Sequence, residues 1–310
     1  MSETGTDNTA RFPGGVIVPM VTPLTERFDL DEAAARRLID RIVAGAAAGV
    51  FVLGTTGEMA SLPTSIRRRL VDLAVEHVAG RALTLAGVSD NCVARVGATA
   101  GEYFARGVDA VVAHAPWTYP LDDEEQKDFF SALADGAGGA PVVLYNMPKI
   151  TGTSIPLGVL KALAGHPSVV AYKDSQNDPA RLAAVMAGVG GRSDFAVFVG
   201  VASRAAEAMR GGADGFVPSC GNLVPDRCRR LYDAAVAGDW AAADAAQDDI
   251  NRVGAVYQAG RSLGGSLAAL KAALAEAGLC GPTVMPPLRT LDADQRRAVR
   301  GAMQPLGLAT

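Results

Sequence analysis

Short apolar runs alternate with alanine-rich amphipathic segments along most of this 310-residue chain. Short apolar runs bounded by turn residues are typical of buried strands, and amphipathic segments between them are typical of helices that cover a parallel sheet. The pattern therefore predicts repeated βα units. The expected strands lie at residues 16–20, 50–53, 83–86, 110–113, 142–145, 169–172, 196–199 and 215–217.

The segments between these strands begin with helix start signals. Asp31-Glu32, Pro63-Thr64, Asp122-Asp123-Glu124 and Asp178-Pro179 stand where helices are expected to begin, and acidic residues and proline favour a first helical turn. Eight strands, each followed by a helix and with no long linker, predict a closed (β/α)8 TIM barrel. The alternative, a doubly wound open sheet, is disfavoured because no GxGxxG motif follows the first strand.

The chain from Val224 onward is predicted to be entirely helical, with later helices at 240–257, 266–277 and 292–303. A barrel needs one helix after its eighth strand, so the remainder predicts a C-terminal helical extension. We accordingly divide the chain into a disordered tail (residues 1–11), a barrel (residues 12–236) and the extension (residues 237–310).

Charge and hydropathy exclude several classes of function. The net charge is −4 and both signs are interspersed, so we expect no nucleic-acid partner. Glycine, aspartate or arginine interrupts every apolar stretch before the roughly 20 residues that a membrane-spanning helix needs. The polar N-terminus lacks the apolar core of a signal peptide. These features predict a cytoplasmic protein that acts on a small molecule.

The cysteines and histidines do not form a metal-binding pattern. Cys92, Cys220, Cys228 and Cys280 include no CxxC pair, and the three histidines are far apart in the sequence. The sequence therefore predicts buried free thiols in a reducing compartment and no metal.

Lys173 follows the apolar run Val169-Val170-Ala171-Tyr172, which places an ammonium group where a buried strand should end. In a parallel barrel, the C-terminal ends of the strands face the active site. A lysine among apolar neighbours has a lowered pKa, and its free amine can attack a ketone to form a Schiff base. The alternative is that Lys173 ends the strand in a solvated loop.

Polar groups also follow two other predicted strands. The small residues of the Gly54-Thr55-Thr56-Gly57-Glu58 turn leave backbone N–H groups and two hydroxyls free to converge on a carboxylate, although the turn could equally cap a helix. Tyr145, in Tyr145-Asn146-Met147-Pro148, could transfer protons to a bound intermediate or simply lie at the barrel rim. All three features occupy C-terminal strand ends, which favours a common site.

Together, these motifs resemble the dihydrodipicolinate synthase and N-acetylneuraminate lyase family of pyruvate-dependent class I aldolases. The resemblance covers nearly the whole chain, from Gly15-Val16-Ile17-Val18-Pro19 through GTTGE and YNMP-x-x-TG to Lys173 and Gly211-Gly212-Ala213-Asp214-Gly215. The combination of GTTGE, YNxP-x-x-TG and a later lysine is specific.

The resemblance implies a role for each matching residue. Lys173 would form the Schiff base with pyruvate or another 2-keto acid, and Tyr145 would be the general acid and base. Thr55 would hydrogen-bond to Tyr145, while Thr56 and the backbone at 55–56 would hold the keto-acid carboxylate. Gly200 and the Val217 carbonyl would line the pocket. The resemblance also implies an aldehyde partner, no metal or organic cofactor, and a homotetramer built from dimers.

Three positions depart from the family pattern, two of them at the second substrate and one in the proton relay. Ile150 stands where the synthase branch has an arginine that holds a carboxylate, and Ala202-Ser203 replace the acidic pair of the sialic-acid branch. Thr118 replaces a tyrosine that usually joins the neighbouring subunit's proton relay, with Tyr119 one place later.

The apolar residues Trp117, Ile150 and Val201 indicate an acceptor that is less hydroxylated than a sugar acid. The predicted function is a Schiff-base lyase acting on a 2-keto acid such as a 2-keto-3-deoxy sugar acid. The alternatives are a related dehydratase, a 4-hydroxy-tetrahydrodipicolinate synthase, and a non-catalytic keto-acid-binding relative.

Overall fold

The computed structural model of the chain describes residues 12–309. The predicted tail, residues 1–11, lies outside the described residues. Eight parallel strands form one closed barrel in the order β1 to β8, which confirms the predicted (β/α)8 architecture. The strands are β1 (Gly15–Pro19), β2 (Gly49–Val52), β3 (Leu83–Gly87), β4 (Ala110–His114), β5 (Val142–Asn146), β6 (Val169–Asp174), β7 (Ala196–Val199) and β8 (Gly215–Phe216).

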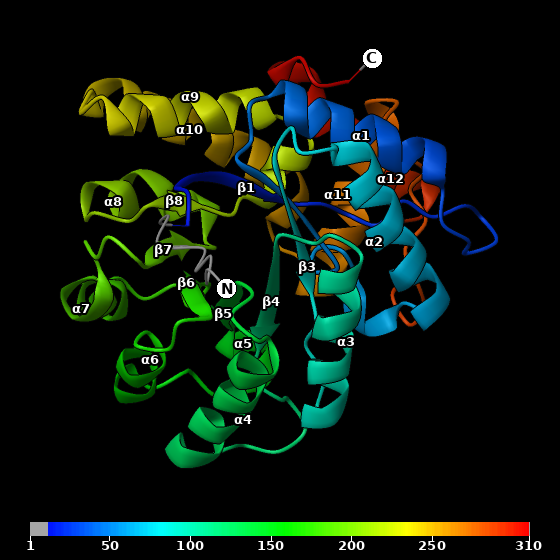
Figure 1. Ribbon diagram of the computed structural model, residues 1–310. Helices are drawn as coiled ribbons and strands as arrows, with labels where there is room; N and C mark the ends of the chain where they lie inside the picture. Colours follow the sequence, from blue (N-terminus) through cyan, green and yellow to red (C-terminus); the bar gives the residue numbers. More distant parts are fainter. Residues whose placement is uncertain (1–11, 310) are drawn as a thin grey trace.

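Helices surround the strands on all sides (Figure 1). Two of them follow β5, where Gly152 at a φ of 75° ends the first short helix. The helices of the barrel are α1 (Glu32–Ala44), α2 (Thr64–Val78), α3 (Val93–Ala105), α4 (Asp123–Gly136), α5 (Pro148–Thr151), α6 (Leu157–Leu163), α7 (Pro179–Val189), α8 (Ala205–Arg210) and α9 (Pro225–Val236).

The predicted helix starts are correct, and at three of the four a side chain caps a backbone N–H group as expected. Asp31 accepts a hydrogen bond from the Ala34 N–H, and Asp122 forms a capping box with Glu125. Asp178 caps α7 through the N–H of Arg181, and α2 begins at Thr64.

The C-terminal part contains α10 (Trp240–Gln258), α11 (Leu263–Glu276) and α12 (Ala293–Met303). The helix α10 packs against α9 and α11, and α11 packs against α12. These three helices match those predicted at 240–257, 266–277 and 292–303 to within a few residues, and residues 277–292 connect α11 to α12 without helix. Pro282, Pro286 and Pro287 lie in this segment, and proline lacks the N–H that a helix interior needs.

Two apolar clusters form the core. One fills the barrel interior and includes Ile17, Phe51, Val112, Tyr145 and Phe198. The larger one lies between the sheet and the surrounding helices. Because alternate residues of a strand face opposite sides, the inward-facing residue at the C-terminal end of each strand is left at the open rim of the barrel.

Candidate functional site

A row of three polar side chains crosses the C-terminal rim of the barrel. The strand register pairs His114 with Tyr145 and Tyr145 with Lys173. Paired residues on adjacent strands point to the same face, and Tyr145 belongs to the interior cluster, so all three side chains face into the barrel. Tyr145 is therefore flanked by an amine on one side and an imidazole on the other.

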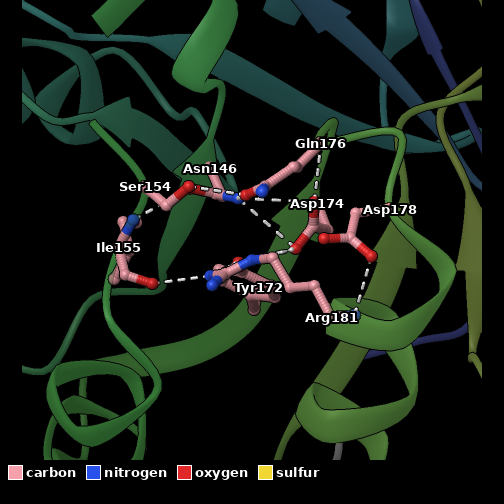
Figure 2. Close-up of polar contacts among 8 residues, drawn as sticks. All are labelled: Asn146, Ser154, Ile155, Tyr172, Asp174, Gln176, Asp178 and Arg181. Carbon is pink, nitrogen blue, oxygen red and sulfur yellow. Dashed lines mark hydrogen bonds and ion pairs between the residues drawn. The ribbon is translucent and has the colours of Figure 1, made fainter. Parts of the chain in front are cut away.

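A network of hydrogen bonds fixes the end of β6 (Figure 2). Asp174 faces away from the barrel interior and accepts hydrogen bonds from the Tyr172 hydroxyl at 2.8 Å, from Arg181 Nε at 3.2 Å and from the Gln176 N–H at 2.7 Å. Lys173 lies between Tyr172 and Asp174 in the strand and points the other way. The buried carboxylate of Asp174 therefore anchors the strand on the face opposite to the Lys173 amine.

The same network holds the end of β5. Asn146 accepts a hydrogen bond from the Ile155 N–H at 2.9 Å, and Arg181 Nη2 donates to the Ile155 carbonyl at 2.6 Å (Figure 2). Asn146 Nδ2 also lies 3.4 Å from both carboxylate oxygens of Asp174. The strand ends that carry Tyr145 and Lys173 are thus fixed relative to each other by outward-facing neighbours.

The Lys173 amine is enclosed by aromatic rings. Its side chain is only 6% exposed, and Nζ lies 3.8 Å from the centroid of the Tyr145 ring and 5.2 Å from that of Phe51. Burial lowers the pKa of Lys173 below its ordinary value of 10.5, although Tyr145 partly opposes this effect. Within residues 12–309, no carboxylate forms an ion pair with Lys173.

A second buried lysine provides a contrast. Lys271 is 1% exposed and forms an ion pair with Glu58, and its Nζ also donates to the Thr283 carbonyl at 2.7 Å. The second carboxylate oxygen of Glu58 accepts from the Met285 N–H at 2.7 Å. This pair joins the loop after β2 to the C-terminal segment. Lys271 thus has the partners of a structural lysine, whereas Lys173 does not.

The Tyr145 phenol is surrounded by groups that stabilise its anion. Burial alone would raise the pKa of Tyr145, but the adjacent Lys173 ammonium and the hydroxyls of Thr55 and Ser175 outweigh it. The pKa of the phenol therefore lies below its ordinary value of 10.0. A phenol with a lowered pKa transfers its proton more readily near neutral pH.

Lys173 opens into a cleft of about 350 Å³ at the mouth of the barrel. Five of the residues to which the family resemblance gives a role line it: Thr55, Thr56, Tyr145, Gly200 and Val217. The other lining residues are Pro19, Met147, Lys149, Ser175, Asn177, Val201, Ala202, Ser203, Ser219, Gln258, Arg261, Leu263 and Ser266.

The absence of a side chain at Gly200 leaves room for the amine. A Cβ atom at this position would lie 1.9 Å from Ser175 Oγ and 3.0 Å from Lys173 Cε. No real Cβ tolerates the first of these contacts, so another residue here would displace Ser175 and the lysine stem.

Three further predicted residues, Gly54, Trp117 and Ile150, line a separate cavity of about 260 Å³ beside the cleft. The two hollows share Thr55, Tyr145 and Leu263 as walls. Val201, grouped with Trp117 and Ile150 from the sequence, lines the cleft instead.

The structure brings neither Thr118 nor Tyr119 into either hollow. The Asn91 side chain accepts hydrogen bonds from the N–H groups of Trp117 and Thr118, at 2.8 and 3.1 Å, and Tyr119 is 71% exposed. Asn91 holds this loop so that only Trp117 lies over the barrel mouth. The sequence did not reveal this arrangement because it depends on a contact between two loops.

Sequence reasoning missed His114 and Arg261. His114 directly follows the apolar run of β4, so the argument that selected Lys173 could also have found it. Arg261 lies between α10 and α11, and nothing in the sequence indicates that it reaches the barrel mouth. Cys92 is partly exposed, whereas the other three cysteines are buried free thiols as predicted.

Comparison with known proteins gives the family. The model of the dihydrodipicolinate synthetase family matches residues 12–305. The chain belongs to this family. As a member of the dihydrodipicolinate synthetase family, it is a lyase of the aldolase type.

Two curated relatives illustrate the similarity. A 4-hydroxy-tetrahydrodipicolinate synthase of Xanthomonas campestris is 38% identical over 233 residues, which cover 74% of this chain and 76% of the relative. An uncharacterised DapA-like lyase of Halobacterium salinarum is 33% identical over 95% of this chain and 94% of its own length.

Solved structures of the family superpose closely. The YagE protein of Escherichia coli K12, in complex with pyruvate, gives a TM-score of 0.90 at 25% identity and covers 96% of this chain and 99% of its own. The dihydrodipicolinate synthase of Bacteroides thetaiotaomicron gives 0.89 at 30% identity, with coverages of 94% and 98%.

Between Phe12 and Ala309, no group of His, Cys, Asp and Glu side chains is arranged to hold a metal ion. No helix in this part of the chain has both the length and the apolar character that a membrane crossing requires.

Proposed function

We propose that this protein forms a Schiff base between Lys173 and the C2 carbonyl of pyruvate or another 2-keto acid, and makes or cleaves a carbon–carbon bond to an aldehyde. The observation that carries the proposal is the buried Lys173 amine, which has a lowered pKa and opens into a cleft beside Tyr145. The pyruvate complex of the similar YagE protein supports this choice of substrate.

The cleft suits a 2-keto acid electrostatically. Lys149 and Arg261 line it, and two cations at the mouth of a cleft attract an anionic substrate. Next to Lys173, the turn at Thr55 and Thr56 offers hydroxyls and backbone N–H groups to the carboxylate. Leu53, which begins this turn, has a left-handed φ of 59°, so the backbone turns sharply at the end of β2.

The chemistry follows from the arrangement of Lys173 and Tyr145. The free amine attacks the C2 carbonyl, and Tyr145 supplies the proton with which the carbinolamine oxygen leaves as water. The resulting iminium withdraws electrons from C3, so that C3 becomes an enamine carbon that attacks an aldehyde. Tyr145, with Thr55 on its phenol, then protonates the new alkoxide. Cleavage is the reverse sequence.

The alternatives differ in the second substrate. A dehydratase would use the same iminium but expel a hydroxyl group. Several relatives are named 4-hydroxy-tetrahydrodipicolinate synthase, but here Ile150 occupies the position of the carboxylate-binding arginine and lines an apolar cavity. This favours a different aldehyde. A non-catalytic keto-acid-binding role is disfavoured by the shared environment of Lys173, Tyr145 and Thr55.

The proposal includes the remaining properties that the resemblance implies. The lysine iminium supplies the electrophile, so the reaction needs no metal or organic cofactor. We also propose a homotetramer and a cytoplasmic location; the family resemblance supports the first and the charge and hydropathy of the chain support the second.

Trapping of the Schiff base tests the proposed function. Incubation with pyruvate and borohydride is expected to add one reduced pyruvyl group to the peptide that contains Lys173. Mass spectrometry of the digest separates this peptide from those of Lys127, Lys149, Lys161 and Lys271. If no peptide gains the adduct, both the lyase mechanism and the keto-acid-binding alternative with a Schiff base are wrong.

The rate of trapping is expected to depend on pH in the direction set by the Lys173 pKa. Only the free amine attacks pyruvate, so the rate falls as pH drops through the pKa. At pH 7.5 about one in a thousand ordinary lysine side chains is the free amine, and this share rises about tenfold for each pH unit by which the pKa is lowered. Because the pKa of Lys173 is lowered, the midpoint of the plot of trapping rate against pH, measured with cyanoborohydride as the reductant, should lie below 10.5. A midpoint at or above that of N-acetyl-lysine amide would contradict the assignment.

A further inference from the structure

The cavity beside Tyr145 is a mostly apolar space. Its volume is about 260 Å³, and its walls come from the ends of β2 and β4, the loop after β2, α11 and the loop before α12. The apolar lining residues are Phe51, Leu53, Met59, Ala60, Val112, Trp117, Ile150, Leu263, Leu267 and Leu288. An apolar cavity of roughly 150 Å³ can hold a benzene molecule, so this space admits a ring with a short substituent.

No uncompensated charge faces this cavity. Among the described residues that line it, only Glu58 carries a formal charge, and its carboxylate is already bound by the Lys271 ammonium and the Met285 N–H. A carboxylate or phosphate placed here would lose its hydration without gaining a cationic partner. The cations of the site, Lys149 and Arg261, line the cleft instead. The cavity therefore suits an uncharged group.

His114 supplies one directed polar group. It is 5% exposed and lines the cavity, with its ring edge-to-face against both Trp117 and Tyr145. Its Nδ1 lies 2.8 Å from the Ala115 carbonyl, which can only accept, so Nδ1 carries the proton and Nε2 has a free lone pair. Within residues 12–309, Nε2 has no hydrogen-bond partner. Burial lowers the pKa of His114 below its ordinary value of 6.5 and Lys173 adds to this effect, while the hydrogen bond to the Ala115 carbonyl opposes it, so the neutral ring is favoured.

We propose that this cavity is the binding site for the side chain of the second substrate, and that it selects an uncharged aryl or branched-alkyl aldehyde. Tyr145 and Thr55 line both the cleft and the cavity. An aldehyde whose side chain occupies the cavity therefore has its carbonyl carbon next to the keto acid held on Lys173. His114 Nε2 accepts a hydrogen bond from the hydroxyl that the reaction creates. This inference rests on the proposed function.

The reaction balances without an additional reactant. Enamine formation removes one proton from the pyruvate methyl group. Its C3 then bonds to the aldehyde carbon, the C=O π pair moves to oxygen, and that oxygen takes up one proton. Water hydrolyses the iminium, which frees the lysine amine and releases a 4-hydroxy-2-oxo acid. Pyruvate and RCHO thus give RCH(OH)CH2COCO2− and nothing else.

A matched aldehyde panel tests the inference. Condensation with pyruvate is measured for benzaldehyde, isobutyraldehyde, glyceraldehyde and succinic semialdehyde. We expect kcat/KM for the first two to exceed that of the hydroxylated and the charged aldehyde by about tenfold or more. Preference for glyceraldehyde or succinic semialdehyde would overturn the inference, as would Schiff-base formation with no turnover of benzaldehyde or isobutyraldehyde.

Two variants locate the effect in the cavity. Leu267→Gln and Leu288→Gln each change a residue that lines the cavity and not the cleft, and they lie on different segments, α11 and the loop before α12. Each should reduce kcat/KM for benzaldehyde about tenfold, with unchanged pyruvate trapping. Ala275→Gln, on α11 but outside both hollows, is the control and should change neither quantity. Equal losses for all aldehydes would overturn the inference.

The same experiment separates failure of the inference from failure of the proposed function. A wild-type protein that forms the Lys173 adduct but does not prefer apolar aldehydes overturns only the inference. A wild-type protein that forms no adduct overturns both.

Discussion

Lys173→Ala is expected to abolish the borohydride-trapped adduct and to lower kcat/KM by on the order of 10⁴-fold or more, because the covalent intermediate can no longer form. The rest of the site should remain folded, since Asp174, Tyr172 and Arg181 hold the end of β6 on the opposite face. Steady-state kinetics and mass spectrometry of the trapped protein measure both effects, and circular dichroism checks the fold.

Lys161→Ala is the matched control for this variant. Lys161 lies on the exposed side of α6, away from both hollows, so its removal should leave adduct yield and turnover at wild-type values. Adduct formation that survives in Lys173→Ala would assign the Schiff base to another lysine and refute the mechanism.

Tyr145→Phe is expected to lower kcat by on the order of 10³-fold, and to slow adduct formation as well as the later steps. The ring would still pack over Lys173 and against His114, but the phenolic proton that leaves with the carbinolamine oxygen would be missing. Single-turnover trapping with pyruvate separates slow imine formation from slow aldol chemistry.

Tyr172→Phe provides a comparison for Tyr145→Phe. Tyr172 is the next tyrosine on the neighbouring strand, but its hydroxyl bonds to Asp174 on the outer face. Loss of this hydroxyl should affect stability more than proton transfer, so imine formation should retain nearly its wild-type rate in the folded fraction. If both variants slow imine formation equally, Tyr145 has no special role in proton transfer.

The barrel and the position of Lys173 could be predicted because both depend on local patterns. Each strand is a short apolar run, and each helix starts at a capping residue such as Asp31 or Asp122. A polar residue that directly ends such a run must lie at the open rim of a parallel barrel. This argument found Lys173 and Tyr145 and would also have found His114.

Other features depend on contacts between distant segments. Glu58 and Lys271 form their buried ion pair across more than 200 residues of chain, and Arg261 reaches the cleft from beyond α10. Asn91 fixes the loop that carries Trp117 and Thr118, so that a one-residue shift in the motif does not bring Tyr119 inward. Nothing local to these residues reveals such pairings.

The sequence by itself determined the architecture, the family resemblance and the position of Lys173 at a strand end, because strand and helix periodicity and strand-end residues are properties of adjacent positions. Only the tertiary structure decided that His114, Tyr145 and Lys173 form one row, since this depends on the register between strands. It also decided that Ile150 and Trp117 share an apolar cavity while Lys149 and Arg261 share the cleft. Which residues line the cavity and which line the cleft depends on how loops and helices pack over the barrel mouth, and this packing is set by contacts between residues far apart in the sequence.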